Sequence, residues 1–222
     1  MRTAYRDEMN AFAADLIVMC DSVHSIMSKS SAALLTANIE SAEDALTQTD
    51  SLEDLRAHCE EKAVQLLALE NPLAKDLRQV VSSIYIVEDL HRMAALAGHV
   101  AKSARRNHPA MAISENIRGY FSELARLVDE MNRRVRELLV NPDADVALRL
   151  TEDDDAVDDI CAHLVKVVTG EGWGGTPREA VDISLLCRFY ERYADHCVNV
   201  SARIIYLATG LVPEEYLDQI KN

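Results

Sequence analysis

Apolar residues recur every three or four positions over long stretches of this chain. One series runs through the first segment, and a second runs from Ile183 to Ala208. The first series consists of Tyr5, Met9, Phe12, Leu16, Met19, Val23, Ile26, Ser30 and Leu34. Alternating steps of four and three place these side chains on one face of a helix, as in a heptad seam. Since no segment shows strand-like alternation, the pattern predicts an all-α protein.

Proline residues divide the chain into stretches that are each long enough for several helical turns. Because proline breaks the interior of a helix, it marks helix starts and connections. The prolines are Pro72, Pro109, Pro142, Pro177 and Pro213. Six long helices are predicted, at residues 3–37, 39–70, 73–107, 111–141, 144–169 and 177–209. Long helices joined by short links pack antiparallel, so helical bundles are expected.

The two halves of the chain resemble each other in the order and spacing of their residues. Residues 90–101 align with residues 190–201, with a shared arginine, a shared alanine and matching apolar positions. Upstream of these, residues 51–55 align with residues 156–160. A three-helix unit that occurs twice is the simplest explanation. We therefore predict two tandem, structurally repeated three-helix bundles. Their bounds are residues 1–108 and residues 109–222.

The charge of the chain limits its partners. The 222 residues include 23 lysines and arginines and 37 aspartates and glutamates, which gives a formal net charge of −14 at pH 7. Such a surface repels nucleic acid backbones and anionic lipid, so binding to either is not expected. No unbroken apolar run approaches the roughly 18–20 residues of a membrane span, and the N-terminus has no apolar signal region. We expect a soluble, cytoplasmic protein without a membrane span.

The cysteines fit the same compartment. They are Cys20, Cys59, Cys161, Cys187 and Cys197. They lie far apart or on apolar stripes, and none of them forms a CxxC motif. An odd number without close pairing favours reduced, buried thiols in a cytosol.

Acidic residues of the second half form two ladders at helical spacing. Residues four apart share a face of a helix. Glu191, Asp195 and Asn199 form one ladder, and Asp154 and Asp158 form the other. If the two helices pack antiparallel, the carboxylates converge; crowded carboxylates need protons, basic partners or metal. Oxygen ligands suit Mg²⁺, Ca²⁺, Mn²⁺ or iron. The alternative is two solvated acidic faces that never meet.

The first half keeps only part of this pattern. The equivalent residues are Thr49, Glu53, His91, Ala95 and His99. Glu53, His91 and His99 form a second, weaker candidate site, which would bind one ion through mixed nitrogen and oxygen donors. The alternative is that these histidines are ordinary helix side chains without a metal.

No motif points to catalysis. The chain has no glycine-rich phosphate loop, no GxSxG and no HExxH. Glu88-x-x-His91 matches one element of di-iron bundles, but a second copy is missing. We therefore predict no catalytic residues. Two alternatives stay open, namely a carboxylate-bridged bundle with oxidase or iron-storage activity and a purely structural bundle without metal.

Two sequence runs resemble the signatures of a known family. Residues 66–78 read LLALENPLAKDLR, and residues 190–199 read YERYADHCVN. They resemble the LLAL..P.A.DLR and ERxxDHxxN signatures of the PhoU family, and the run at 205–210 resembles the way these proteins end. The resemblance covers nearly the whole chain, with both repeats in order.

This resemblance implies a non-enzymatic regulator built from two three-helix bundles, often as a homodimer. PhoU-like proteins act with the ATPase-driven phosphate ABC transporter and with its membrane sensor histidine kinase. They keep the phosphate-starvation response off when phosphate is plentiful. The resemblance therefore implies a cytoplasmic protein that associates with membrane complexes through its partners.

The resemblance also implies a metal site. Some PhoU-like proteins bind metal clusters through a Glu/Asp-x-x-x-Asp motif, which Glu191 and Asp195 match here. Asp154 and Asp158 stand at the supporting positions. The first repeat departs from the motif, so a metal is expected chiefly in the second repeat. The sequence does not distinguish Mg, Mn, Fe, Zn and Ca.

Overall fold

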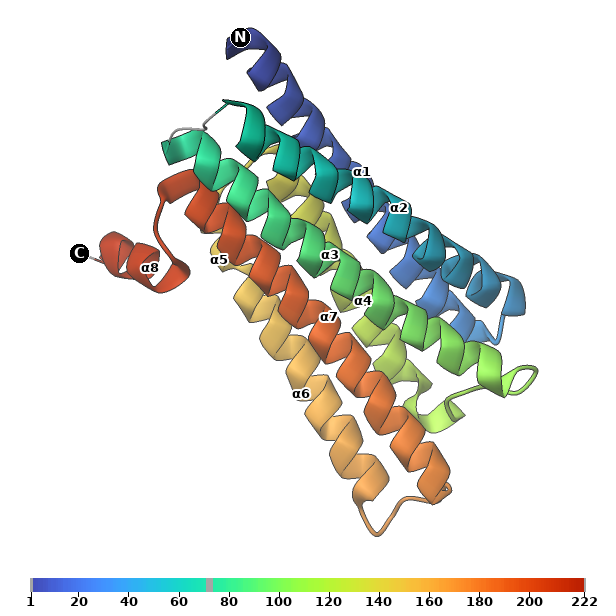
Figure 1. The fold of residues 1–222 in the computed structure, drawn as a ribbon. Helices are drawn as coiled ribbons and strands as arrows, with labels where there is room; N and C mark the ends of the chain where they lie inside the picture. Colours follow the sequence, from blue (N-terminus) through green and yellow to red (C-terminus); the bar gives the residue numbers. More distant parts are fainter. Residues whose placement is uncertain (1, 71–73, 222) are drawn as a thin grey trace.

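The computed structural model describes residues 2–70 and 74–221, and within them helices joined by loops are the only regular secondary structure (Figure 1). Among the described residues, six helices are long and two are short. Their bounds are Arg2–Thr36 (α1), Ile39–Glu70 (α2), Ala74–Asn107 (α3), Glu115–Val140 (α4), Ala144–Leu148 (α5), Leu150–Thr169 (α6), Pro177–Thr209 (α7) and Pro213–Lys221 (α8). The prediction of an all-α protein is confirmed.

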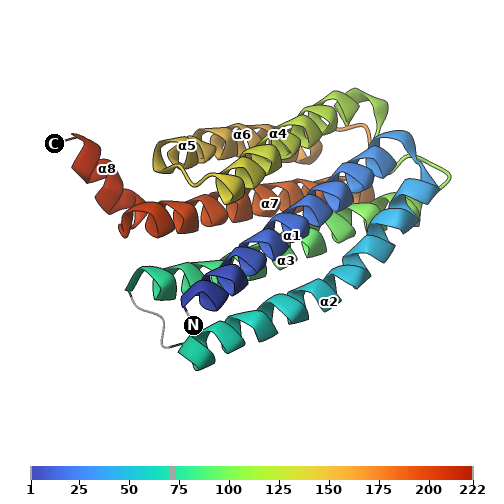
Figure 2. The same ribbon diagram turned by 90° about the horizontal axis from the view of Figure 1, so that it is seen from above.

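The long helices form two bundles that lie side by side (Figure 2). One consists of α1, α2 and α3, and the other is built on α4, α6 and α7. The two bundles meet where α3 packs along α7 and where α1 packs against α4. This arrangement confirms the predicted pair of three-helix bundles. Their predicted boundary lies between α3 and α4 and stays a prediction.

The predicted apolar seams are buried in one continuous core. On α1 the buried members of the seam are Met9, Phe12, Leu16, Met19, Val23, Ile26 and Leu34. On α7 they include Ile183, Cys187, Tyr190, Ala194, Cys197 and Ile204. Burying one large apolar side chain contributes roughly 1.5–3 kcal/mol, so these seams hold each bundle together. All five cysteines are buried and free of disulfides, as predicted.

By length and composition, α1 could cross a membrane. The helix nevertheless contains no long unbroken apolar run, because polar residues such as Asp21, His24 and Ser25 interrupt it. In the structure, however, α1 packs against α2, α3 and α4 and buries its seam among them. The core helix of a soluble protein passes the same test of length and hydropathy, and the buried seam of α1 belongs to the hydrophobic core.

Two details differ from the predicted helices. The segment predicted at 144–169 is divided at Arg149, whose N–H bonds to the Val146 carbonyl three residues back at 3.2 Å. This tighter turn interrupts the α-helical hydrogen-bond ladder. The helix α8 was not predicted, because the six predicted helices end at residue 209. Proline is equally suited to the first turn of a helix, and Pro213 begins α8.

A buried chain of polar contacts joins the two bundles. The Asn132 side chain on α4 accepts a hydrogen bond from the Cys20 thiol at 3.4 Å and donates one to the Tyr193 hydroxyl at 2.9 Å. Nearby, the Ser31 and Tyr190 hydroxyls are 2.8 Å apart. Buried polar groups favour one arrangement of their helices, because any other leaves them without partners.

Replacing Asn132 by alanine is therefore expected to lower the free energy of unfolding by about 1–3 kcal/mol, because two buried groups lose their partner. Urea denaturation followed by circular dichroism would measure this loss. Asn116→Ala, on the exposed first turn of the same helix, is the matched control and should change stability by less than about 0.5 kcal/mol. Equal effects of the two substitutions would contradict the role given to the buried contacts.

Candidate functional site

The carboxylates predicted on α6 and α7 lie near one another in the structure. The two helices pack together, and Asp154 experiences the negative charges of Asp158, Asp195 and Glu191. Burial is the largest cause and these charges add to it, so the pKa of Asp154 is raised to about 6. The pKa of Asp158 is raised for the same reasons. We call these four residues the α6–α7 cluster.

One oxygen atom of the α6–α7 cluster lacks a partner. Asp154 Oδ1 is buried and forms no hydrogen bond with any residue that the structure describes. An ionised carboxylate oxygen that is buried without a partner is costly. Arg188 Nη1 donates to Glu191 Oε2 at 3.2 Å, and the positive charge of Arg188 partly offsets the repulsion on Asp158. The negative charge of ionised Asp154 is therefore not balanced by a hydrogen bond at this oxygen.

The side chains of the α6–α7 cluster do not, as they stand, form a coordination sphere. Among the described residues, no three His, Cys, Asp or Glu side chains are arranged to hold a metal ion. What the structure offers is the donor type, since all four groups are carboxylates, together with an orphaned buried oxygen. Both features fit a hard cation. A metal at this cluster stays a prediction.

Asn199 is separate from the α6–α7 cluster. Its amide donates to Asp89 Oδ1 on α3 at 3.5 Å, and the same oxygen lies 2.8 Å from His196 Nδ1. Asn199 also lies two turns, about 12 Å, from Glu191 along the helix, and its part in a metal site stays a prediction. Asp89 was not anticipated as its partner.

The weaker candidate site of the first repeat is also divided. Glu53 Oε1 and His91 Nε2 are 2.6 Å apart. His99 lies about 12 Å farther along α3, and its ring stacks on Phe189 with centroids 5.0 Å apart. The structure therefore pairs Glu53 with His91 and leaves His99 on the seam between the bundles. A metal in this repeat stays a prediction.

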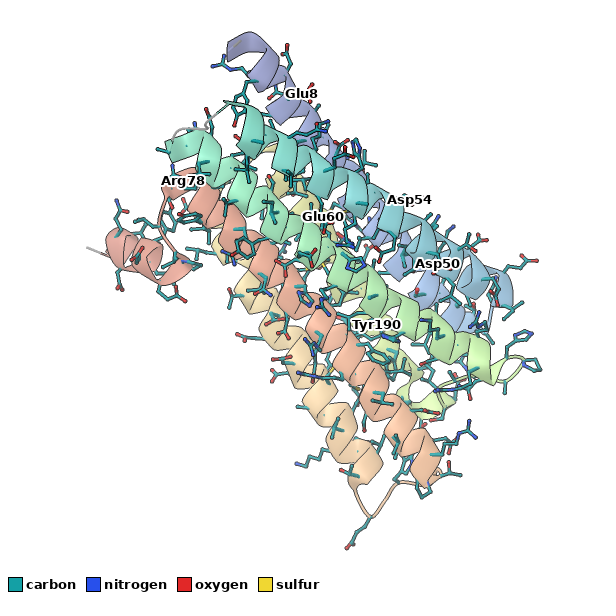
Figure 3. The ribbon with its side chains drawn as sticks, viewed as in Figure 1. Glu8, Asp50, Asp54, Glu60, Arg78 and Tyr190 are labelled. Atoms are coloured by element: carbon teal, nitrogen blue, oxygen red, sulfur yellow. The ribbon has the colours of Figure 1, made fainter. Side chains whose placement is uncertain are left out.

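The first repeat contains a cation that the sequence reasoning overlooked. Arg56 on α2 donates from Nε to Glu53 at 3.0 Å and forms an ion pair with Glu60, which is labelled in Figure 3. Its Nη1 also lies 3.5 Å from Glu88 on α3. Hydrogen bonds from Arg56 and then from His91 hold the pKa of Glu53 below its usual value. This is the opposite of the shift at Asp158, its equivalent in the second repeat.

Comparison with known proteins identifies the family to which both halves are similar. Residues 16–104 and 121–204 match the model of the PhoU domain. The chain is 42% identical over 213 residues to a Mycobacterium tuberculosis protein described as phosphate-specific transport system accessory protein PhoU homolog 2. That match covers 96% of this chain and 100% of the relative. The chain is also 41% identical to PhoU homolog 1 of Mycobacterium leprae, over 97% of each protein.

Solved structures show the same fold. The crystal structure of PhoU from Pseudomonas aeruginosa matches with a TM-score of 0.82 at 24% identity, over 93% of this chain and 100% of that one. The structure of the phosphate transport system regulatory protein PhoU from Streptococcus pneumoniae matches with a TM-score of 0.83 at 22% identity, over 94% and 98% of the two chains. At these identities the likeness concerns the fold.

Proposed function

The chain belongs to the PhoU family, and on this premise we propose that it is a cytoplasmic negative regulator of phosphate uptake. In this role it connects the phosphate ABC transporter, through its ATPase subunit, with a membrane sensor histidine kinase. The observation that carries the proposal is the identity of about 40% to phosphate-specific transport accessory proteins over nearly the full length. PhoU accessory proteins are regulatory proteins and have no enzymatic activity.

The shape of the molecule supports an adaptor. Paired bundles bury a core and leave long helical faces to which partner domains can dock. On α7, Val181 and Leu185 stand one turn apart and are 58% and 47% exposed. In such a role, binding of the adaptor shifts the populations of two conformations of the kinase and transporter. This kind of signalling requires no catalysis by the adaptor. A homodimer and attachment to membrane complexes through these partners belong to the same proposal.

The proposal includes a metal at the α6–α7 cluster. A divalent cation or iron would be held by Asp154, Asp158, Glu191 and Asp195. Among their oxygen atoms, Asp154 Oδ1 would gain the partner that it lacks in the metal-free protein. When bound, the cation would reverse the local charge, so that phosphate could be attracted to an otherwise repulsive surface. The carboxylates themselves repel free phosphate.

Deletion of the gene tests the regulatory role. In phosphate-rich medium, deletion is expected to derepress the transcripts of the phosphate transporter, and the intact gene should restore repression. The strain must lack any second PhoU gene that could compensate. Unchanged transcripts in such a strain would overturn the proposal and would leave only the fold established.

A further inference from the structure

Three carboxylates from two helices surround the guanidinium group of Arg56. Glu53 and Glu60 lie three residues before it and four residues after it on α2, and Glu88 reaches it from α3. Glu53 in turn contacts His91 at 2.6 Å. We call these carboxylates and His91 the α2–α3 cluster. The Arg56 side chain is only 28% exposed, so its charge is held close to the carboxylates.

The second repeat has no such arrangement at the equivalent position. When the two repeats are aligned, residues 51–55 match residues 156–160. Arg56 then corresponds to Cys161. Cys161 is buried and uncharged, and it donates only to a backbone carbonyl. The second repeat does contain an arginine, Arg188, which pairs with Glu191 at 3.2 Å but leaves Asp154 Oδ1 without a partner, whereas Arg56 contacts all three carboxylates around it.

We propose that Arg56 is a fixed cation that takes the place of a metal ion in the first repeat and excludes metal from the α2–α3 cluster. A guanidinium group stays charged at any physiological pH and offers several donors in a rigid fork, so it satisfies carboxylates from both helices without a cofactor. A second cation placed among the same carboxylates would be repelled by it. Only the α6–α7 cluster would then bind metal when metal is supplied. This contrast between the two repeats rests on the proposed function, which places a metal at the α6–α7 cluster.

The chain offers a matched control on α4. Arg126 also pairs with one glutamate three residues before it and another four residues after it, at 2.9 Å to Glu123 and 2.7 Å to Glu130. Among the described residues, its ion pairs stay within its own helix. Arg126 therefore reproduces the pattern of Arg56 along the helix and lacks the carboxylate from a neighbouring helix.

The test is a titration with Mn²⁺ alone, in which electron paramagnetic resonance measures the free ion. Arg56→Met and Arg126→Met are each made in the full chain that also carries Asp154→Asn and Asp158→Asn. Arg56→Met is expected to gain one Mn²⁺ site per chain, bound at least tenfold more tightly than any site in Arg126→Met. The freed carboxylates and His91 are suitable ligands for Mn²⁺. Arg56→Lys, which keeps the charge, should gain no site.

Each outcome decides the question. Equal Mn²⁺ binding by the Met variants at positions 56 and 126, or a new site in Arg56→Lys, would overturn the proposal. If Arg56→Met, or Arg56→Gln as a second neutral variant, folds only with Mn²⁺ by circular dichroism, the metal has replaced the guanidinium group and the proposal stands. If both remain unfolded with Mn²⁺, it is overturned. The comparison of wild type with Asp154→Asn/Asp158→Asn tests the α6–α7 cluster separately.

Discussion

Replacing Asp154 and Asp158 by asparagine is expected to stabilise the metal-free protein and to abolish its stabilisation by divalent cations. Burial and like charges raise the pKa of Asp154 to about 6 in the folded chain, above the ordinary value of 3.8. The folded state thus holds this proton more tightly than the unfolded state. The resulting stabilisation is complete below about pH 4 and is lost as the pH rises to about 6, so that ionised Asp154 destabilises the fold relative to a neutral amide at pH 7.5.

The size of this effect follows from the shift. A pKa change of about two units corresponds to about 3 kcal/mol, and partial exposure reduces the expected gain of the variant to about 1 kcal/mol in the presence of a chelator. With Mn²⁺ at 100 times its dissociation constant, the wild type should gain about 2.7 kcal/mol, whereas the variant should gain none. The order of stability of the two proteins therefore reverses on addition of metal.

Urea denaturation at pH 7.5, with chelator and with Mn²⁺, would measure both effects. Asp50→Asn/Asp54→Asn is the matched control, since these two aspartates have the same spacing on an exposed face of α2 (Figure 3). It should respond to Mn²⁺ as the wild type does. If the wild type gains no stability from Mn²⁺, or if the Asp154/Asp158 variant gains as much, the α6–α7 cluster is not a metal site.

The fold was predictable because its determinants are local and periodic. The seam of α7 repeats at helical spacing, Thr176 and Glu179 form a capping box at its start, and Gly210 ends it at a positive φ of 83°. Each of these signals can be read within a few residues. The break at Arg149 was not predictable in the same way, because a single tighter turn leaves the apolar period on either side unchanged.

The candidate sites were predictable only where they are formed by helices that follow each other directly in the sequence. The packing of α6 on α7 follows from the short loop between them, so the proximity of Asp154 to Asp195 could be anticipated. The bond from Asn199 to Asp89 requires the docking of one bundle on the other, which no local spacing reveals. Arg56 was overlooked for a similar reason, since its spacing to Glu53 and Glu60 is that of any exposed helix ion pair.

Replacing Tyr190 by alanine is expected to cause the largest loss of stability, about 3–5 kcal/mol, which is a large part of the 5–15 kcal/mol typical of a folded domain. The Tyr190 ring is fully buried and meets Phe121 edge-on, with centroids 6.1 Å apart. Its hydroxyl lies 2.8 Å from Ser31, so the residue belongs to the interface of the two bundles as well as to its own core. Both the cavity and the lost contact lower the stability.

Tyr190→Phe separates these two contributions, because it keeps the ring and removes the hydroxyl; it should lose only about 1 kcal/mol in urea denaturation. Similar losses in the two variants would contradict the packing role of the ring.

Tyr190 stands next to Glu191 on α7 but points into the core, so its variants also calibrate the assay in cells. Tyr190→Ala should derepress phosphate-transporter transcripts because less folded protein accumulates, and Tyr190→Phe should not. Derepression by Asp154→Asn/Asp158→Asn at an unchanged protein level would then report on the α6–α7 cluster itself and not on the stability of the fold.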